Sequence, residues 1–350
     1  MEDVPTRVVV AGVGRFGTLH VRAWTEAGAR VVGVVDADPG RAREVAAAYA
    51  VPEHGEDLRR MVASARPDVV VVASDEASHS DLTDIALEAG CHVFVEKPFA
   101  LAVERAVRTR DLAARAGRSV VVGHISRFAA PYRYMRQALE AGRLGELWAM
   151  RLRRDFSRAW FLGFGDRVHP VWESCIHDID LAVYFAGTRA ARVVAMQSRA
   201  AGPAAPSVVS ALVEFASGVT ATIESAWTVP ASAPDTLVGA LALDGAIVGE
   251  AELLGSAGTL RQRLVNDALT EWGPGGSVAP DLSLWPEIDG RLGGALATEV
   301  AYALDVFAGR RPNTLMPESE AVWGVEIAEA IVASLGSGAP VVLAGRAAVP

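Results

Sequence analysis

Five short apolar runs rich in valine divide the first 124 residues of the chain. Continuous apolar runs, unlike alternating ones, are typical of strands that are buried on both faces of a parallel sheet. The runs are Arg7–Ala11, Val31–Asp36, Asp68–Ser74, His92–Glu96 and Ser119–His124. Helical patterns separate them, at Phe16–Ala27, Pro39–Ala50, Ser78–Ala89 and Leu101–Ala116. This alternation predicts a doubly wound α/β domain over residues 1–124.

The pattern changes after Phe128, where longer strands and hairpin turns appear. The expected helices are Tyr132–Ala141, Ser174–Ala186, Leu292–Phe307 and Glu318–Leu335, and the expected strands are Val193–Ser198, Val208–Phe215, Val219–Trp227, Leu237–Leu243 and Ala246–Glu250. The segments "FASGVTA" and "LDGAI" read as hairpin turns. Sequential hairpins followed by helices predict an α+β domain over residues 125–350, with a mostly antiparallel sheet.

Composition excludes several classes of protein. The net charge is −9 and the isoelectric point is about 5.4, which argues against a nucleic-acid partner. Two cysteines, Cys91 and Cys175, give no disulfide framework. There is no apolar run of about 18 residues to span a membrane and no pattern of a signal peptide. A cytoplasmic protein is therefore expected.

A nucleotide site is predicted at "VVVAGVGRFG", which places Gly12, Gly14 and Gly17 in G-x-G-x-x-G spacing between a strand and a helix. The glycines allow a tight turn, the approach of a pyrophosphate and close packing of the helix on the strand, while the helix N-terminus stabilises the phosphates. Asp36 ends the second run, where an acid binds ribose hydroxyls and repels a 2′-phosphate. NAD is therefore favoured, although Arg41 is near enough to weaken the preference against NADP.

Lys97 is the one lysine among 33 strong cations. A position that needs only positive charge could hold arginine, as the others do. Lysine differs because its ammonium can be deprotonated after burial, whereas guanidinium cannot. Lys97 also follows the fourth run, and ligands of open α/β sheets bind outside the carboxyl ends of the strands.

The stretch "WESCIHDIDLAVYFAG" supplies a candidate base. Glu173 and His177 are four residues apart and share one face of a helix, and Asp180 can also reach that face. A histidine flanked by carboxylates is suited to general acid–base work. Zinc binding by Cys175, His177 and Glu173 is the weaker alternative, because no further cysteine or histidine is spaced to complete the site.

The chain resembles the Gfo/Idh/MocA oxidoreductase family, which includes glucose–fructose oxidoreductase and inositol 2-dehydrogenase. The resemblance is carried by "AGVGRFG", "VVGVVDADPGRAREVA", "HSDLTDIALEAGCHVFVEKPFA", "ISRFAAPYRYMRQALEAGRLGEL" and "IHDIDLAVYFAG". It implies a Rossmann domain followed by a domain with a large open sheet, which commonly forms a dimer or tetramer interface.

The resemblance also implies chemistry. Lys97 would bond the reacting oxygen of a sugar, aminosugar or cyclitol, and His177 would be the general acid/base in hydride transfer to or from nicotinamide. Inositol dehydrogenase-like members have aspartate where this chain has Glu173, so inositol itself is not assured. Other relatives are NAD-retaining glycoside hydrolases or non-catalytic nucleotide-sensing regulators, and these remain alternatives.

The expected site residues are then as follows. Those expected at the cofactor are Gly12, Val13, Gly14, Arg15, Phe16, Gly17, Asp36, Arg41, Ser74, His79, Glu96 and Lys97. His79 has capping of its helix as the alternative role. The substrate candidates are Arg127, Asp155 and Trp160; the aromatic residues Phe156, Trp160 and Phe161 could equally pack in the core.

Overall fold

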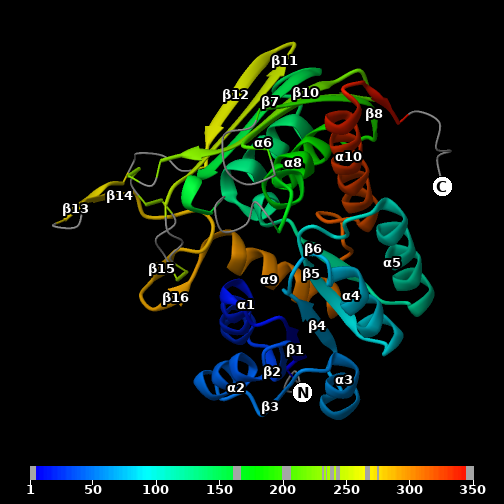
Figure 1. Cartoon of the computed structure of the whole chain (residues 1–350), viewed down its shortest axis with the longest axis vertical. Coiled ribbons are helices and arrows are strands. Elements are labelled where there is room, and N and C mark those ends of the chain that lie inside the picture. Colours follow the sequence, from blue (N-terminus) through cyan, green and yellow to red (C-terminus); the bar gives the residue numbers. More distant parts are fainter. Residues whose placement is uncertain are drawn as a thin grey trace. The chain divides into compact units, whose positions relative to one another are not determined.

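The computed structural model divides the chain into two compact units (Figure 1). Unit 1 comprises the chain up to Ile125 together with Glu287–Val322, and unit 2 comprises Ser126–Pro286 and the chain from Trp323 onward. The segment Glu287–Val322, assigned from the sequence to the second domain, thus groups with the first. The structure describes residues 5–160, 167–198, 206–230, 232–233, 235–236, 240–241, 245–264, 269–273 and 276–343.

Unit 1 contains a six-stranded parallel sheet in the order β3-β2-β1-β4-β5-β6. Its strands are β1 (Arg7–Ala11), β2 (Arg30–Val35), β3 (Glu53–Gly55), β4 (Val69–Val72), β5 (His92–Glu96) and β6 (Val120–Gly123). Its helices are α1 (Arg15–Glu26), α2 (Pro39–Ala48), α3 (Leu58–Ala65), α4 (His79–Glu88), α5 (Val103–Ala116) and α9 (Gly294–Phe307). The order reverses between β1 and β4, so the predicted doubly wound fold is confirmed.

The valine runs form the core of this sheet. Every residue of β4 is buried and inaccessible to solvent. Helices α3, α4 and α5 contact one another in sequence order, and α1 contacts α9. Because both faces are covered in this way, continuous valine rather than alternation is the pattern that the strands require.

The returning segment Glu287–Val322 is fixed to unit 1 by polar and aromatic contacts. It begins with the two-stranded β15 (Glu287–Ile288) and β16 (Arg291–Leu292). Arg22 of α1 lies 2.7 Å from the Glu287 carboxylate, and Trp24 stacks on Phe307 with 6.4 Å between ring centroids. At the edge strand β6, the Asn313 side-chain amide donates a hydrogen bond to the Val120 carbonyl. The Glu318 carboxylate accepts a hydrogen bond from the Val120 N–H. This segment therefore covers an edge and a face of unit 1.

Unit 2 is built on a seven-stranded sheet in the order β12-β11-β7-β10-β9-β8-β17, in which only β7 and β10 pair in parallel. Its strands are β7 (Leu147–Ser157), β8 (Ala190–Ser198), β9 (Val208–Phe215), β10 (Thr220–Val229), β11 (Ile247–Gly255), β12 (Gly258–Arg263) and β17 (Val341–Val342), with a separate hairpin of β13 (Glu271–Gly273) and β14 (Gly276–Val278). Its helices are η1 (Ile125–Phe128, which begins in unit 1), α6 (Ala130–Glu140), η2 (Val171–Cys175), α8 (Ile176–Ala186) and α10 (Glu318–Ser337, shared with unit 1). The predicted, mostly antiparallel sheet is confirmed.

The hairpin predicted at "FASGVTA" is the β9–β10 turn, in which β9 ends at Phe215 and β10 begins at Thr220. The "LDGAI" turn and the strand expected at Leu237–Leu243 fall largely outside the described residues. The long strand β7 lies near the middle of the sheet, although the sequence pattern does not predict it.

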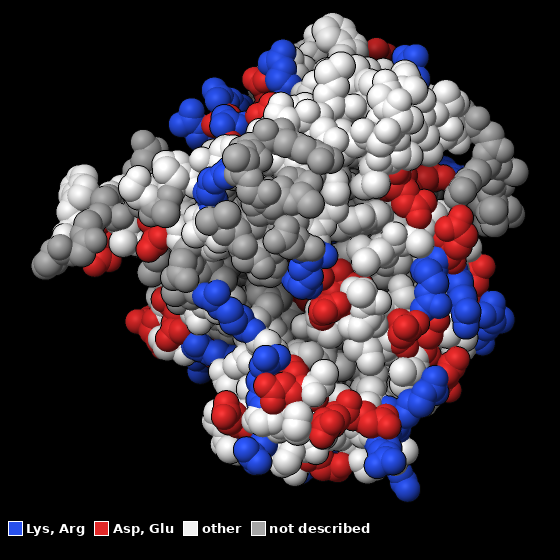
Figure 2. All heavy atoms as spheres, viewed as in Figure 1, with Lys and Arg blue, Asp and Glu red and all other residues white. Residues whose placement is uncertain are grey.

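Surface charge on the drawn face is mixed. Figure 2 shows acidic and basic side chains interspersed rather than gathered by sign. None of the described helices is both long enough and apolar enough to cross a membrane.

Candidate functional site

The loop between β1 and α1 has the shape of a phosphate cradle. Gly12 has φ +86°, and a Cβ there would lie 2.4 Å from Ser74 Cα. A Cβ at Gly17 would lie 1.8 Å from the Gly12 carbonyl oxygen, so both positions require glycine. At Gly14, by contrast, a Cβ would meet no described atom within 4 Å. Gly14 is the N-cap residue of α1 and has no side chain to cap the helix. The backbone N–H groups of the first turn of α1 can therefore donate hydrogen bonds to a pyrophosphate.

The carboxylate of Asp36 organises the same loop. It accepts hydrogen bonds from the backbone N–H groups of Val13 and Asp38, both at 2.9 Å, and only 8% of the residue is exposed. Arg41 Nη1 lies 3.2 Å from Asp36 Oδ1, and about half of the Arg41 side chain, 49%, is exposed. An acid and a cation therefore stand together where the sequence predicts the ribose site.

Lys97 follows β5 directly and is half-buried. Its backbone N–H donates to Glu96 Oε2 at 3.2 Å, while Glu96 Oε1 lies 2.8 Å from His20 Nε2. The peptide bond between Lys97 and Pro98 is cis. Both carboxylate oxygens of Glu96 thus have partners within the protein, so this carboxylate supports the Lys97 loop rather than standing open to a ligand.

His79 joins two loops at the carboxyl end of the sheet. Its Nδ1 lies 2.9 Å from the Pro98 carbonyl oxygen and its Nε2 lies 3.1 Å from the Ser74 carbonyl oxygen. The residue is only 1% exposed. The histidine therefore neither caps α4 nor faces outward, and it links the loops that follow β4 and β5. Of the other residues expected at the cofactor, Arg15 is exposed and Phe16 is half-buried at the start of α1.

Unit 2 contributes a π-helical turn, η2, that runs directly into α8. Glu173 lies in η2 and His177 in the first turn of α8, and both are half-buried. Between them Ser174 is fully buried, and its hydroxyl donates to the Pro170 carbonyl at 2.8 Å and accepts from Trp227 Nε1 at 3.0 Å. Single π-helical turns occur frequently at functional sites. Ser174 thus ties this turn to Trp227 of β10, a connection that the sequence pattern does not predict.

The aspartates of "IHDID" are held by buried arginines. Asp178 receives two hydrogen bonds from Arg154, at 2.9 and 3.1 Å. Asp180 receives hydrogen bonds from Arg127 Nε at 2.9 Å and Nη2 at 2.8 Å, and Arg127 is completely buried. Arg127, expected at the substrate, is therefore a structural partner of α8. Asp180, expected to share a face with His177, is committed to that pair.

Asp155 and Trp160 lie in different surroundings. Asp155 shares a face of β7 with Arg153, whose Nη2 lies 2.5 Å from Asp155 Oδ2. Burial raises the pKa of the Asp155 carboxyl. Arg154, the residue between them, points to α8. Because successive side chains of a strand alternate between faces, Asp155 lies on the sheet face opposite to α8. The structure thus does not bring Asp155 together with His177.

Trp160 adjoins the aromatic residues beside η2. Its ring centroid lies 5.6 Å from that of Phe156 and 6.5 Å from that of Trp227. Since Trp227 donates to Ser174, this cluster connects Trp160 with the π-helical turn. Phe161 lies outside the described residues.

The zinc alternative has little support from Cys175. Burial raises the pKa of its thiol to about 12, and the residue is completely buried. A zinc ligand must be a thiolate. Among the described residues no cluster of three or more metal-binding side chains is present.

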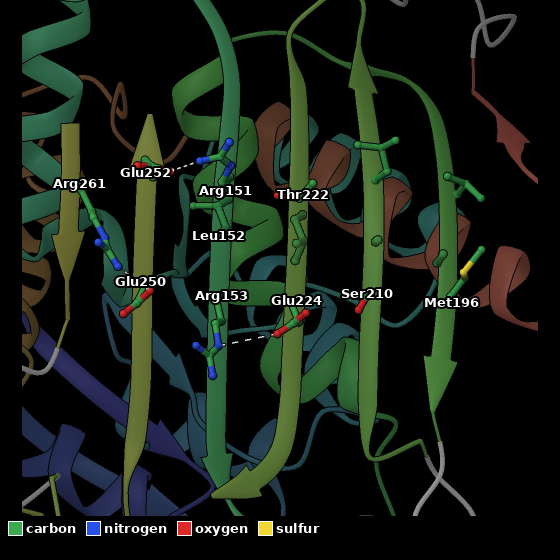
Figure 3. Close-up of a pocket in the computed structure, with 15 residues that line it drawn as sticks. Arg151, Leu152, Arg153, Met196, Ser210, Thr222, Glu224, Glu250, Glu252 and Arg261 are labelled. Atoms are coloured by element: carbon green, nitrogen blue, oxygen red, sulfur yellow. Dashed lines mark hydrogen bonds and ion pairs between the residues drawn. The ribbon is translucent and has the colours of Figure 1, made fainter. Parts of the chain in front are cut away.

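A groove of about 740 Å³ lies on the sheet face of unit 2 that the helices leave uncovered (Figure 3). Arginine and glutamate side chains cross it in ion pairs, such as Arg151 with Glu252 at 2.6 Å and Arg153 with Glu224 at 3.7 Å. None of the residues lining the groove is Glu173, Trp160 or His177. The groove is therefore separate from the predicted catalytic residues of unit 2.

Comparisons with known proteins match both parts of the chain. A family model described as "Oxidoreductase family, NAD-binding Rossmann fold" matches residues 6–124, and one described as "GFO/IDH/MocA C-terminal domain" matches residues 132–261. Inositol 2-dehydrogenase of Rhizobium meliloti is 30% identical over 226 residues, which are 63% of this chain and 68% of that one.

Other relatives are similar. Inositol 2-dehydrogenase 1 of Saccharopolyspora erythraea is 34% identical over 62% of this chain, and the match spans 66% of that relative, just under two thirds. The crystal structure of scyllo-inositol dehydrogenase from Lactobacillus casei with bound NAD(H) and scyllo-inositol superposes with a TM-score of 0.80, at 22% identity, over 97% of this chain and 99% of that one. This last likeness shows that the fold is shared.

The buried pair of Arg127 and Asp180 predicts a large loss of stability on truncation. Arg127→Ala leaves the Asp180 carboxylate buried without its cation, so the free energy of unfolding should fall by about 3–5 kcal/mol. The double substitution Arg127→Met with Asp180→Leu should lower the free energy of unfolding by less than Arg127→Ala alone, because it leaves no unpaired buried charge. Urea unfolding measures both changes.

The exposed pair of Arg310 and Asp305 provides the control, with side chains 54% and 42% exposed. Arg310→Ala should lower the unfolding free energy by no more than about 1 kcal/mol. Equal losses for Arg127→Ala and Arg310→Ala would contradict the structural role assigned to the buried pair.

Proposed function

We propose, from the premise that the chain belongs to the Gfo/Idh/MocA oxidoreductase family, that it is an NAD-dependent dehydrogenase of a secondary alcohol on a cyclitol, sugar or aminosugar. The reverse reduction of a ketone uses the same groups. The relatives compared above are named as dehydrogenases, which favours this activity over a glycoside hydrolase or a regulator.

The observation that carries the proposal lies within unit 1. The β1–α1 loop, the loop after β4 and the Lys97 loop meet at the carboxyl end of one parallel sheet, where Gly12 packs on Ser74 and His79 joins Ser74 to Pro98. Dinucleotides bind at this end of such a sheet. Lys97 is consequently next to the site that the glycines form.

The residues present fit NAD. The open space at Gly14 and the uncapped N-terminus of α1 suit the pyrophosphate, with Val13, Arg15 and Phe16 alongside. Asp36 and Arg41 suit the adenosine ribose. When bound, NAD supplies a hydride acceptor that no side chain can provide.

The protein's own groups would then handle the proton. We assign Lys97 to hydrogen-bond the reacting oxygen and to relay its proton, and His177 to act as the general base that finally takes this proton, with Glu173 orienting His177. Trp160 would pack against an apolar face of the substrate ring. The alcohol loses one hydride and one proton in total, so a hydride acceptor and a base together balance the oxidation.

Substitution of the catalytic pair tests this reaction. His177→Ala should lower kcat by about 10²–10⁴, the usual contribution of a general acid–base group. Lys97→Arg should fail nearly as badly as Lys97→Ala, because guanidinium keeps the charge but cannot release a proton. NADH formation with inositols, sugars and aminosugars measures turnover, and NAD titration confirms that each variant still binds cofactor. Lys97→Arg activity within about tenfold of the wild type would contradict a proton-relay role.

Cofactor choice should depend on Asp36 and Arg41 in opposite directions. Asp36 repels a 2′-phosphate, so NAD(H) should bind more tightly than NADP(H). Asp36→Ala should therefore reduce the ratio of the NADP(H) to the NAD(H) dissociation constant. Arg41→Ala should increase this ratio, because it removes the cation that offsets the negative charge of Asp36. Fluorescence titration gives the four dissociation constants for each variant. Tighter binding of NADPH than of NADH by the wild type would contradict the assignment.

We further propose that the uncovered sheet face of unit 2 joins two copies of the chain. Met196 and Leu212, which line the groove on this face, are 74% and 46% exposed in the single chain. A self-complementary face predicts a symmetric oligomer. Light scattering should give a mass above the 36.8 kDa of one chain, and Met196→Asp with Leu212→Asp should reduce it. A wild-type mass near 36.8 kDa at micromolar concentration would reject the proposal.

A further inference from the structure

Lys97 lies between two residues that are each bonded by a buried histidine. On one side the Glu96 carboxylate meets His20, and on the other the Pro98 carbonyl meets His79. The histidines come from α1 and α4, two helices that follow loops of the nucleotide site. Neither ring is exposed by more than 1%. The loop that carries Lys97 is thus fixed on both flanks.

The contact from His20 has little freedom. Its ring packs edge-on against Phe16, with 5.3 Å between centroids, and at a tilt of 56° against Phe94, with 5.1 Å between centroids. Its Nε2 lies 2.8 Å from Glu96 Oε1, and the other oxygen of this carboxylate accepts the N–H of Lys97. A shift of His20 would therefore reach the Lys97 backbone through one rigid carboxylate.

The neighbouring strand also leaves room for this carboxylate. Gly123 of β6 pairs with Glu96 across the sheet. A Cβ at Gly123 would lie 2.8 Å from Glu96 Oε1, too close for a real contact. The absence of a side chain at Gly123 is thus a condition for the position that Glu96 takes.

The contact from His79 reaches the other flank. Its Nδ1 faces the Pro98 carbonyl and its Nε2 faces the Ser74 carbonyl. Carbonyl oxygens only accept hydrogen bonds, so a neutral ring can donate to one of the two at a time. Ser74 itself packs on Gly12, so this path runs from the glycine loop to the residue after Lys97.

We propose that His20 and His79 are positioning residues that fix the backbone on the two sides of Lys97, through Glu96 and Pro98, and hold its ammonium where the reacting oxygen arrives. The proposal rests on the function proposed above. Neither histidine touches substrate. Their role is to fix the backbone on each side of Lys97, since a displacement of about 1 Å can cost about 10²-fold in rate.

His20 contacts Glu96 through Nε2, whereas His79 contacts Pro98 through Nδ1. This difference permits a test in which the same two substitutions should have opposite effects at the two positions. Glutamine places its amide near the position of a histidine Nε2, and asparagine places its amide near Nδ1. His20→Gln and His79→Asn should therefore keep the bonds to Glu96 and Pro98, whereas His20→Asn and His79→Gln should lose them. Because all four variants are polar and similar in size, a general effect of substitution on folding would not follow this reciprocal order. Exposed His54 provides the matched control, His54→Gln.

Steady-state kinetics on a productive substrate should separate the variants. His20→Asn and His79→Gln should lower kcat by about 10–100-fold, with the NAD dissociation constant nearly unchanged. His20→Gln, His79→Asn and His54→Gln should stay close to the wild type. Equal kcat in all five, per molecule that binds NAD, would overturn the proposal and leave the histidines with a purely structural role.

A second measurement does not depend on turnover. Because Lys97 is the one lysine, an amine-acylating reagent modifies only it and the chain's α-amino group, and mass spectrometry follows each. Without NAD, acylation of half-buried Lys97 should be faster in His20→Asn and His79→Gln than in the other variants. Unchanged rates in both would also overturn the proposal. If instead NAD fails to protect Lys97 in the wild type and no substrate is oxidised, the proposed function fails while the acylation rates still decide the role of the histidines.

Discussion

Helix α8, which carries His177, is held by two buried ion pairs. Asp178 meets Arg154 of β7, and Asp180 meets Arg127 of η1. Residues two apart on an α-helix project about 200° from each other, so the pairs hold the helix from nearly opposite sides. Replacing buried pairs by apolar residues is often neutral for stability, so we propose that these two pairs chiefly fix rotation about the helix axis. Ser174 then fixes the π-helical turn before the helix.

Much of unit 1 could be predicted from the sequence because its determinants are local. Strands buried on both faces need apolar side chains at every position, and the five valine runs all became strands within about two residues of the expected bounds. The glycines are likewise specified by backbone geometry, since a Cβ at Gly12 or Gly17 would overlap the main chain. Once the strand order is known, Lys97 must lie at the carboxyl end of the sheet.

Several of the missed features involve partners that are distant in sequence. Strand β7 reads "LWAMRLRRDFS", in which Arg154 and Asp155 stand at buried positions and disturb the alternation that marks a half-covered strand. The pairing with Asp178, from a different part of the chain, explains why Arg154 is inside. The pairing of Arg127 with Asp180 is hidden in the sequence for the same reason, because the two residues are 53 positions apart. His20 carried only a weak signal, its place on the buried side of α1, and its bond to Glu96 spans 76 residues.

The return of Glu287–Val322 to unit 1 bears on how the chain is made. Protein synthesis releases the N-terminal residues first, and domains generally fold as units while later parts are still being added. Here all six strands of the parallel sheet have been synthesised by Gly123. On the edge strand, however, the N–H of Val120 has its partner in Glu318 and the carbonyl of Val120 has its partner in Asn313, which are synthesised much later. Until those residues leave the ribosome, that edge presents unpaired backbone groups of the kind that recruit other strands. The nascent sheet is therefore at risk of aggregation while residues 124–313 are being synthesised, and its protection arrives only after the sheet of unit 2 has been synthesised almost entirely.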